Sequence, residues 1–285
     1  MNGKGTMNVY VDGKSIFGEY LGLGNILYQV ATAIYYSEKY NYRICLINNP
    51  GILYGTSNYF GRNKSIIINS KYIGYNITIL HKLNWVESES SNCQIIEHNY
   101  SCDTVIPDMT KDIFIKGYCQ NISLFKEYIH KIPDYLKLSD SSIINYINKK
   151  YPNLGNSICI GLRIGEDFQH MTKIKFDSYK KALHKFKEMD ISIDTIYILS
   201  DIKDGWNLHF DTLSEFKAVD VDEADIIQFY VGLHCKHYIL SESTFHAWIA
   251  YLGMLKSPDK KAICFNDTDI TNKNLSMESW IRIDY

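Results

Sequence analysis

Residues His237–Leu252 read HYILSESTFHAWIAYL, a pattern that predicts a junction between a strand and a helix. The apolar run His237–Leu240 predicts a short strand, and the residues from Thr244 onward predict a helix. The turn between them puts Ser243 or Thr244 in the first helical turn. Backbone N–H groups at a helix start lack helical partners and lie at the positive end of the dipole, so the junction suits an anion. An ordinary N-cap explains the same residues, so other segments must decide.

The rest of the second half alternates between strand and helix patterns. Strands are predicted at Ser157–Leu162, Thr195–Ser200, His237–Leu240 and Lys261–Phe265, and helices at Asp177–Met189, Glu223–Leu233 and Thr244–Leu255. This alternation predicts a parallel sheet covered on both faces. Ligands of such sheets bind beyond the carboxyl ends of the strands.

The first half begins with a predicted βαβ unit. Its parts are a strand at Met7–Val11, a glycine-rich turn at Gly22–Asn25, a helix with apolar positions at 27, 30, 31 and 34, and a strand at Arg43–Ile47. A further strand is expected at Asp112–Gly117 and a helix at Ser123–His130. Residues 48–112 are irregular, and we expect them to hold an insertion that shapes a binding site.

The polar segment Ser139–Asn156 is the predicted boundary between two domains. The fold class is therefore α/β, with two Rossmann-like α/β domains, 1–150 and 151–285, facing a cleft. The length of 285 residues allows this division.

Composition excludes several classes of protein. An apolar fraction of 46% and a charged fraction of 22% are typical of a soluble globular protein. A net charge of −2 argues against non-specific nucleic-acid binding. The seven scattered cysteines form no C-x-x-C pair and fit buried thiols in a reducing compartment. No apolar run approaches ~18 residues, so we expect no membrane span and a cytoplasmic location. The sequence carries no signal for the oligomeric state.

Polar turns follow the strands of the second half. Arg163 leaves its strand where a guanidinium can make bidentate contacts to a diphosphate. Pairing with Glu166 or Asp167 at the surface is the equally weighted alternative. Ser200 and Asp201 follow the next strand, where they either cap the next element or meet a ligand.

Two other ligand classes are disfavoured. The Gly22–Asn25 turn fails the dinucleotide fingerprint because Leu27 holds the third glycine position, and the following strand ends in Asn48-Asn49 without an acidic ribose anchor. The Asp-x-Asp triplets at 220–222 and 267–269 suit helix-dipole and turn roles. His234 and His237 have no further ligands nearby, so no metal site is predicted.

Taken in order, these segments resemble the α-1,2-fucosyltransferase family, glycosyltransferase family eleven. Leu21–Ala31 has the frame of the family's G-G-L-G-N-Q-hydrophobic-F-Q-Y-A segment, and Gly117–Phe125 is similar to its G-Y-x-Q-S-E-x-Y-F segment. Ser200–Trp206 echoes S-D-D-I-x-W, and Glu242–Leu252 matches N-S-S/T-F-S-W-W-A/G-A-x-L. Trp280 fits the closing tryptophan. The ordered set covers nearly the whole chain.

The chain also departs from the family pattern. Where the family has H-x-R-R-G-D, this chain reads Gly161–Glu166: Arg163, Gly165 and an acid are kept, and the His and the second Arg are lost. Glu242 stands in place of the usual Asn, and His246 in place of Ser.

The resemblance implies a GT-B-like fold, with an acceptor-side first domain and a nucleotide-sugar-binding second domain. It also implies an inverting transfer of L-fucose from GDP-β-L-fucose to a sugar hydroxyl of a glycan, in α-1,2 linkage, without a metal or other cofactor. Site roles then follow in this chain's numbering. Arg163 stabilises the leaving diphosphate and Glu166 is a candidate base, while the other donor-binding residues are Gly22, Gly24, Asn25, Ser200, Asp201, Ser243, Thr244 and Phe245.

Three alternatives stay open at this point. The altered Arg motif permits a transferase of the same fold that uses another nucleotide-sugar. The lost His and Arg permit a non-catalytic protein that binds nucleotide-sugars or glycans. An NAD-dependent oxidoreductase is disfavoured by Leu27.

Overall fold

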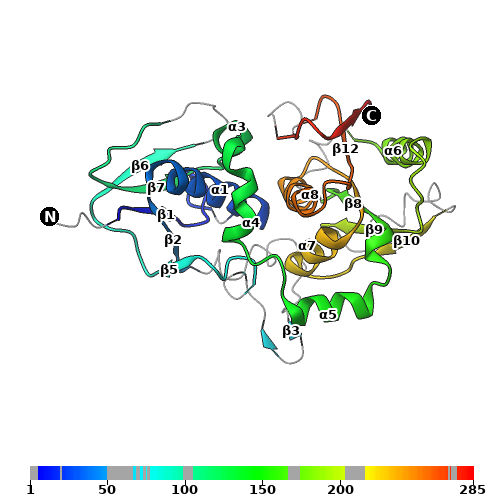
Figure 1. The fold of residues 1–285 in the computed structure, drawn as a ribbon, viewed down its shortest axis with the longest axis horizontal. Coiled ribbons are helices and arrows are strands. Elements are labelled where there is room, and N and C mark those ends of the chain that lie inside the picture. Colours follow the sequence, from blue (N-terminus) through cyan, green and yellow to red (C-terminus); the bar gives the residue numbers. More distant parts are fainter. Residues whose placement is uncertain are drawn as a thin grey trace. The chain divides into compact units, whose positions relative to one another are not determined.

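The computed structural model describes residues 6–19, 21–49, 67–68, 71–72, 75, 78–98, 105–165, 174–202, 216–268, 270 and 275–285 (Figure 1). The chain divides by packing into two compact units. The first unit holds Met1–Thr56 and Ile73–Leu138, and the second holds Ser57–Tyr72 and Ser139–Tyr285. The predicted domains 1–150 and 151–285, and a cleft between them, stay predictions.

The first unit is built on a parallel sheet in the order β5-β2-β1-β7-β6. Its strands are β1 (Asn8–Val11), β2 (Arg43–Ile47), β5 (Asn84–Val86), β6 (Cys93–Glu97) and β7 (Asp112–Lys116). Helix α1 (Leu23–Tyr40) connects β1 to β2 and packs on the central strands, which confirms the predicted βαβ unit. Its core-facing residues are almost fully buried because apolar positions recur at helical spacing.

The predicted helix Ser123–His130 is shorter and less regular than expected. The structure has α3 (Ile122–Phe125), a 3₁₀ segment η1 (Lys126–Lys131) and α4 (Ile132–Tyr135). The Asn121 side chain caps α3 by accepting from the backbone N–H of Ser123 at 3.0 Å. Pro133 sits in the first turn of α4, where its missing N–H costs no helical hydrogen bond.

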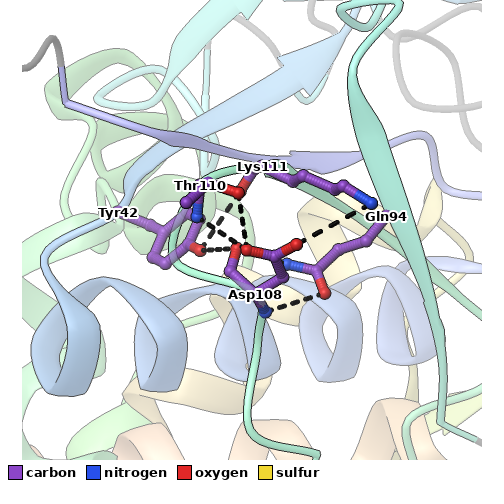
Figure 2. A network of polar contacts seen from close by, with 5 residues as sticks. All are labelled: Tyr42, Gln94, Asp108, Thr110 and Lys111. Carbon is purple, nitrogen blue, oxygen red and sulfur yellow. Dashed lines mark hydrogen bonds and ion pairs between the residues drawn. The ribbon is translucent and has the colours of Figure 1, made fainter.

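A polar network fixes the turn that leads into β7 (Figure 2). The Asp108 carboxylate accepts from Thr110 at its hydroxyl (2.6 Å) and at its backbone N–H (3.0 Å). Gln94 of β6 exchanges two hydrogen bonds with the Asp108 backbone, and the Tyr42 hydroxyl donates to the carbonyl of Lys111. Because these residues lie at the amino ends of β6 and β7, the network stabilises the edge of the sheet opposite to the one where ligands are expected.

The second unit contains a parallel sheet in the order β10-β9-β8-β11-β12-β13. Its strands are β8 (Ser157–Leu162), β9 (Thr195–Ser200), β10 (Lys217–Asp220), β11 (His237–Ile239), β12 (Ala262–Phe265) and β13 (Ile281–Ile283). Its helices are α5 (Ser141–Lys150), α6 (Phe176–Glu188), α7 (Asp225–His234) and α8 (Thr244–Lys256). A 3₁₀ turn η2 (Leu154–Asn156) precedes β8, and β3 (Ile67–Ile68) pairs antiparallel with β4 (Lys71–Tyr72).

Residue alternation along β8 separates the two faces of this sheet. Ile158, Ile160 and Leu162 pack with Leu183 and Phe186 of α6 in one apolar cluster. The intervening residues Cys159 and Gly161 lie on the other face, where they are also buried and Gly161 lies against His246 of α8. The predicted parallel sheet covered on both faces is thus present in this unit, and the α/β fold class is confirmed.

The segment Ser139–Asn156 contains a helix that the sequence analysis did not predict. Asp140 caps α5 by accepting from the N–H groups of Ser142 and Ile143. Ile143 and Ile147, four residues apart, are its buried face. Among the described residues, no helix is both long and apolar enough to cross a membrane.

Candidate functional site

The strands β9, β8 and β11 are neighbours in the second sheet and run parallel. Leu162 at the end of β8 is paired with Ser200 at the end of β9, so Arg163 and Asp201 leave the sheet side by side. Serine-rich residues leave β11 at the same edge. The topology therefore brings together the three polar turns that the sequence analysis selected in this half.

Arg163 is held by Asp201. Nη1 of Arg163 lies 2.9 Å from Oδ2 of Asp201, and the two side chains are 22% and 11% exposed. The same carboxylate accepts from the backbone N–H groups of Ile164 at 2.9 Å and Gly165 at 3.0 Å. The predicted surface alternative paired Arg163 with Glu166 or Asp167, which lie outside the described residues. The observed partner comes from the neighbouring strand and fixes both the guanidinium and the turn that follows it.

Helix α8 begins at Thr244, one of the two predicted starts, and Ser243 is its N-cap residue. Within the described part of the chain, the Ser243 side chain makes no capping hydrogen bond. Ser243, Thr244 and Phe245 are half-buried, whereas Ser241 and Glu242 are buried. The Phe245 ring packs edge-on against Phe229 of α7 with centroids 5.5 Å apart. The start of the helix is therefore held by the packing of Phe245 on Phe229, and the Ser243 hydroxyl does not cap the helix.

Ser200 is a structural cap in this geometry. Its hydroxyl oxygen accepts from the backbone N–H of Ile202 at 3.1 Å. Its carbonyl accepts from Nε2 of Gln228 at 3.3 Å, and that same amide donates to the carbonyl of Glu223. Gln228 thus ties the end of β9 to the start of α7. The predicted role of Ser200 in donor binding stays a prediction.

Burial and charge set the protonation of the groups around Arg163. Burial first, and then the positive charge of Arg163, lower the pKa of His246 from 6.5 to about 3, so the imidazole is neutral. Burial raises the pKa of Tyr179 well above its usual range, and the negative charges of Glu242 and Asp201 raise it further. The guanidinium of Arg163 therefore lies near the buried, neutral imidazole of His246 and is paired with the carboxylate of Asp201.

The first unit brings two of its sequence segments together. Oδ1 of Asn25 accepts from Nε2 of Gln120 at 2.8 Å, which links the glycine-rich turn to the turn after β7. The fully buried Gln29 of α1 accepts from the N–H of Gly13 and donates to the carbonyls of Lys14 and Gly117. Gly117 needs its lack of a side chain, because its φ is +100°.

Gln29 and Gln120 were not among the predicted site residues. The signal for Gln29 is a polar side chain on the apolar face of a buried helix. The N-cap Gly22 and Asn25 are half-buried and Gly24 is buried. How these residues lie relative to Arg163 stays a prediction, because they belong to the other unit.

Asp12 is a further carboxyl group that the sequence analysis did not select. It follows β1 at the carboxyl edge of the first sheet, and its Oδ1 accepts from the N–H of Lys14 at 3.0 Å. Burial raises the pKa of Asp12 above 3.8, against the opposing effect of Lys14. A carboxylate with a raised pKa at the ligand edge of a sheet is suited to accept a proton.

The predicted catalytic residue Glu166 lies outside the described residues. No group of three or more His, Cys, Asp or Glu side chains is placed to hold a metal ion in the described ranges. The prediction that no metal is needed stays a prediction.

Comparison with known proteins identifies the family. Residues 66–283, well over half of the chain, match glycosyl transferase family 11. A search of curated proteins found no match. Among solved structures, POFUT1 in complex with GDP-fucose is similar in fold, with a TM-score of 0.50 at 10% identity, covering 88% of this chain and 94% of that chain.

Two further similar structures are those of NodZ. The NodZ alpha-1,6-fucosyltransferase co-crystallized with GDP has a TM-score of 0.48 at 12% identity and covers 88% of this chain and 92% of that chain. Fucosyltransferase NodZ from Bradyrhizobium has a TM-score of 0.47 at 12% identity, with 88% and 93% covered. The fold shared with POFUT1 is GT-B-like, and the match to the family confirms the resemblance found in the motifs: the chain belongs to glycosyl transferase family 11 and is a glycosyltransferase by family.

Proposed function

We propose that this protein transfers L-fucose from GDP-β-L-fucose to a sugar hydroxyl of a glycan, with inversion and in α-1,2 linkage. One observation carries the proposal. At the carboxyl edge of the second sheet, Arg163 is fixed by Asp201 beside the start of α8, where Ser243 has no helix-capping bond among the described residues. Family membership supports a sugar-transfer reaction, and POFUT1, which shares the fold, was solved with GDP-fucose.

The leaving group requires positive charge at this site. As the bond from fucose to the β-phosphate oxygen breaks, negative charge builds on the diphosphate. The guanidinium of Arg163 stabilises that charge, and its fixed orientation avoids reorganisation during the step. Ser243, Thr244 and Phe245 supply backbone N–H groups and hydroxyls to the phosphate oxygens at the start of α8.

Asp201 acts in this proposal through Arg163. Its two oxygens accept from Ile164, Gly165 and Arg163, which fixes the turn that faces the phosphates. Ser200 belongs at the nucleoside end of the donor together with Asp201. The three bonds leave about one lone-pair site of the carboxylate, on Oδ1, and we propose that this site accepts from guanine.

The incoming hydroxyl needs a base. Glu166 is the proposed base, and Asp12 is its rival, because it is a half-buried carboxyl at the ligand edge of the first sheet. Gly22, Gly24 and Asn25 are proposed to let the backbone of the first unit approach the donor closely. No cofactor besides the donor is proposed.

A transferase that uses another nucleotide-sugar is the second candidate. The observation that favours it is the engagement of the Asp201 carboxylate by three groups of its own chain, which leaves guanine without a dedicated reader among the described residues. Ile164 also replaces the second Arg of the family motif, so this turn supplies one guanidinium, that of Arg163, where the family motif supplies two.

A panel of nucleotide-sugars separates these candidates. Each compound is first tested for thermal stabilisation of the protein, then for release of the nucleotide and for transfer to glycan acceptors. A shift specific to GDP compounds with GDP release supports fucosyl transfer, and NMR of the product reports the linkage and the anomeric configuration. Preference for UDP- or dTDP-sugars would reject the fucose donor. Stabilisation without turnover would assign a binding protein.

A further inference from the structure

His246 lies where the strand ends of the second sheet meet. It belongs to the first turn of α8, is 5% exposed, and its Nδ1 is 2.7 Å from the hydroxyl oxygen of Ser241. The backbone of Leu199, near the end of β9, also hydrogen-bonds to the ring. A neutral imidazole has one donor and one acceptor nitrogen, which matches a carbonyl and a hydroxyl as partners.

Gly161 of β8 makes room for this ring. A Cβ atom at position 161 would lie 2.3 Å from Cγ of His246, 2.4 Å from Nδ1 and 2.8 Å from Cδ2. Real Cβ atoms do not approach other atoms so closely, and the atoms met are the base of a ring that is only 5% exposed. The imidazole therefore occupies the volume that any side chain at position 161 would need.

The three contacts of the ring share one spacing. Gly161 is two residues before Arg163, Leu199 is two residues before Asp201, and Ser241 is two residues before Ser243. The ring thus contacts β8, β9 and the turn after β11, in each case two residues before Arg163, Asp201 or Ser243. A pKa lowered to about 3 makes His246 a weak base, which argues against a role as a proton acceptor.

We propose that His246 is a positioning residue that fixes the ends of β8, β9 and β11 relative to one another, so that Arg163 and the start of α8 keep one geometry for a nucleoside diphosphate. The role does not require contact with the ligand. The identity of the ligand rests on the proposed function, whereas the coupling between His246 and Gly161 does not.

The test combines a binding measurement with a double-mutant cycle. Wild type, His246→Ala and His246→Asn are titrated with GDP and with inorganic pyrophosphate by calorimetry, at a temperature where each is folded by circular dichroism. His246→Ala should weaken binding at least tenfold, equal to about 1.4 kcal/mol. The amide of His246→Asn keeps a polar partner for Ser241 and should recover part of that loss.

His237→Ala is the matched control. His237 is also buried, at 7% exposure, but it lies at the amino end of β11, where Nδ1 accepts from the N–H of Lys261 at 3.0 Å. This variant should lower the melting temperature and leave the affinity for GDP unchanged. Equal effects of His246→Ala and His237→Ala on affinity would assign His246 a purely structural role and overturn the proposal.

The cycle tests the packing directly. Gly161→Ala should lower the melting temperature strongly or prevent folding, and the same change in the His246→Ala background should cost far less, because the clashing ring atoms are gone. An equal loss in both backgrounds would refute the contact. If wild type binds pyrophosphate but not GDP, the guanosine donor is rejected. The affinities of wild type and the His246 variants are then compared with pyrophosphate as the ligand. Binding of neither ligand by wild type would reject both proposals.

Discussion

Replacing Asp201 by Asn changes the charge at the centre of the proposed site with almost no change in shape. In wild type, Oδ1 accepts from the N–H of Ile164, and Oδ2 accepts from the N–H of Gly165 and faces Arg163 at 2.9 Å. The amide has one oxygen and one NH₂ group. In either orientation the NH₂ group of the amide faces at least one of the N–H donors that the carboxylate accepted from in wild type.

The expected loss follows from those contacts. A donor left without its acceptor in a mostly buried site costs about 1–3 kcal/mol, and the remaining contacts lose their charge assistance. With side chains only 22% and 11% exposed, solvent screens the pair weakly. We therefore expect Asp201→Asn to lower the free energy of unfolding by about 2–4 kcal/mol.

Urea unfolding followed by circular dichroism measures this loss. The control is Asp259→Asn, which removes one charge from the exposed Lys236–Asp259 pair and should leave the unfolding midpoint unchanged. GDP affinity should also fall in Asp201→Asn, although the site becomes more positive, because Arg163 and the turn lose their fixed orientation. Tighter GDP binding with unchanged stability would refute this reasoning, since it would show that Asp201 competes with phosphate.

Three further predictions concern the rest of the molecule. Gln29→Met should lower the free energy of unfolding by about 2–4 kcal/mol in urea, because buried groups of Gly13 and Gly117 lose their partner; a loss near zero would mean that water replaces the amide. The free energy of unfolding should fall as the pH drops from 6.5 toward 4. In the folded protein burial lowers the pKa of His98 and His237 to about 4 and that of His246 to about 3, whereas in the unfolded chain these histidines have their ordinary pKa and therefore bind protons first. His246→Asn should flatten this slope in denaturant titrations at successive pH values, and an unchanged slope would show that other groups cause it. Glu166→Gln should reduce the rate of transfer by roughly 10²-fold or more with GDP affinity kept, whereas Asp12→Asn should not; the reverse result in initial-rate assays would make Asp12 the base.

The central strands were predictable because their apolar runs are continuous. Arg43–Ile47, Ser157–Leu162 and Thr195–Ser200 were predicted with the bounds that the structure shows. The edge strands were not predicted: β6 interleaves polar and apolar residues, and β13 has only three residues. Such short, half-exposed strands are defined by their neighbours more than by their own pattern. Helix α5 was missed because only Ile143 and Ile147 form its buried face.

The site was predictable as a set of strand ends, but its internal contacts were not. Arg163 stood out by its place after a strand, yet its partner Asp201 comes from the next strand in the sheet. Only the adjacency of β8 and β9 brings the two together. Gly161 and His246 were both visible as departures from the family pattern. The sequence alone does not show that Gly161 makes room for the His246 ring, because the close approach of the two residues depends on the packing of α8 on β8.

Titration of GDP into wild type, Arg163→Lys and Arg163→Ala tests the central claim most directly. A charge-assisted contact to phosphate is worth about 1.5–3 kcal/mol, so Arg163→Ala should bind GDP about 10- to 150-fold more weakly than wild type. Arg163→Lys keeps the charge without the bidentate geometry and should lie between them. Wild-type affinity in a folded Arg163→Ala protein would contradict the account, because Arg163 would then not hold the diphosphate.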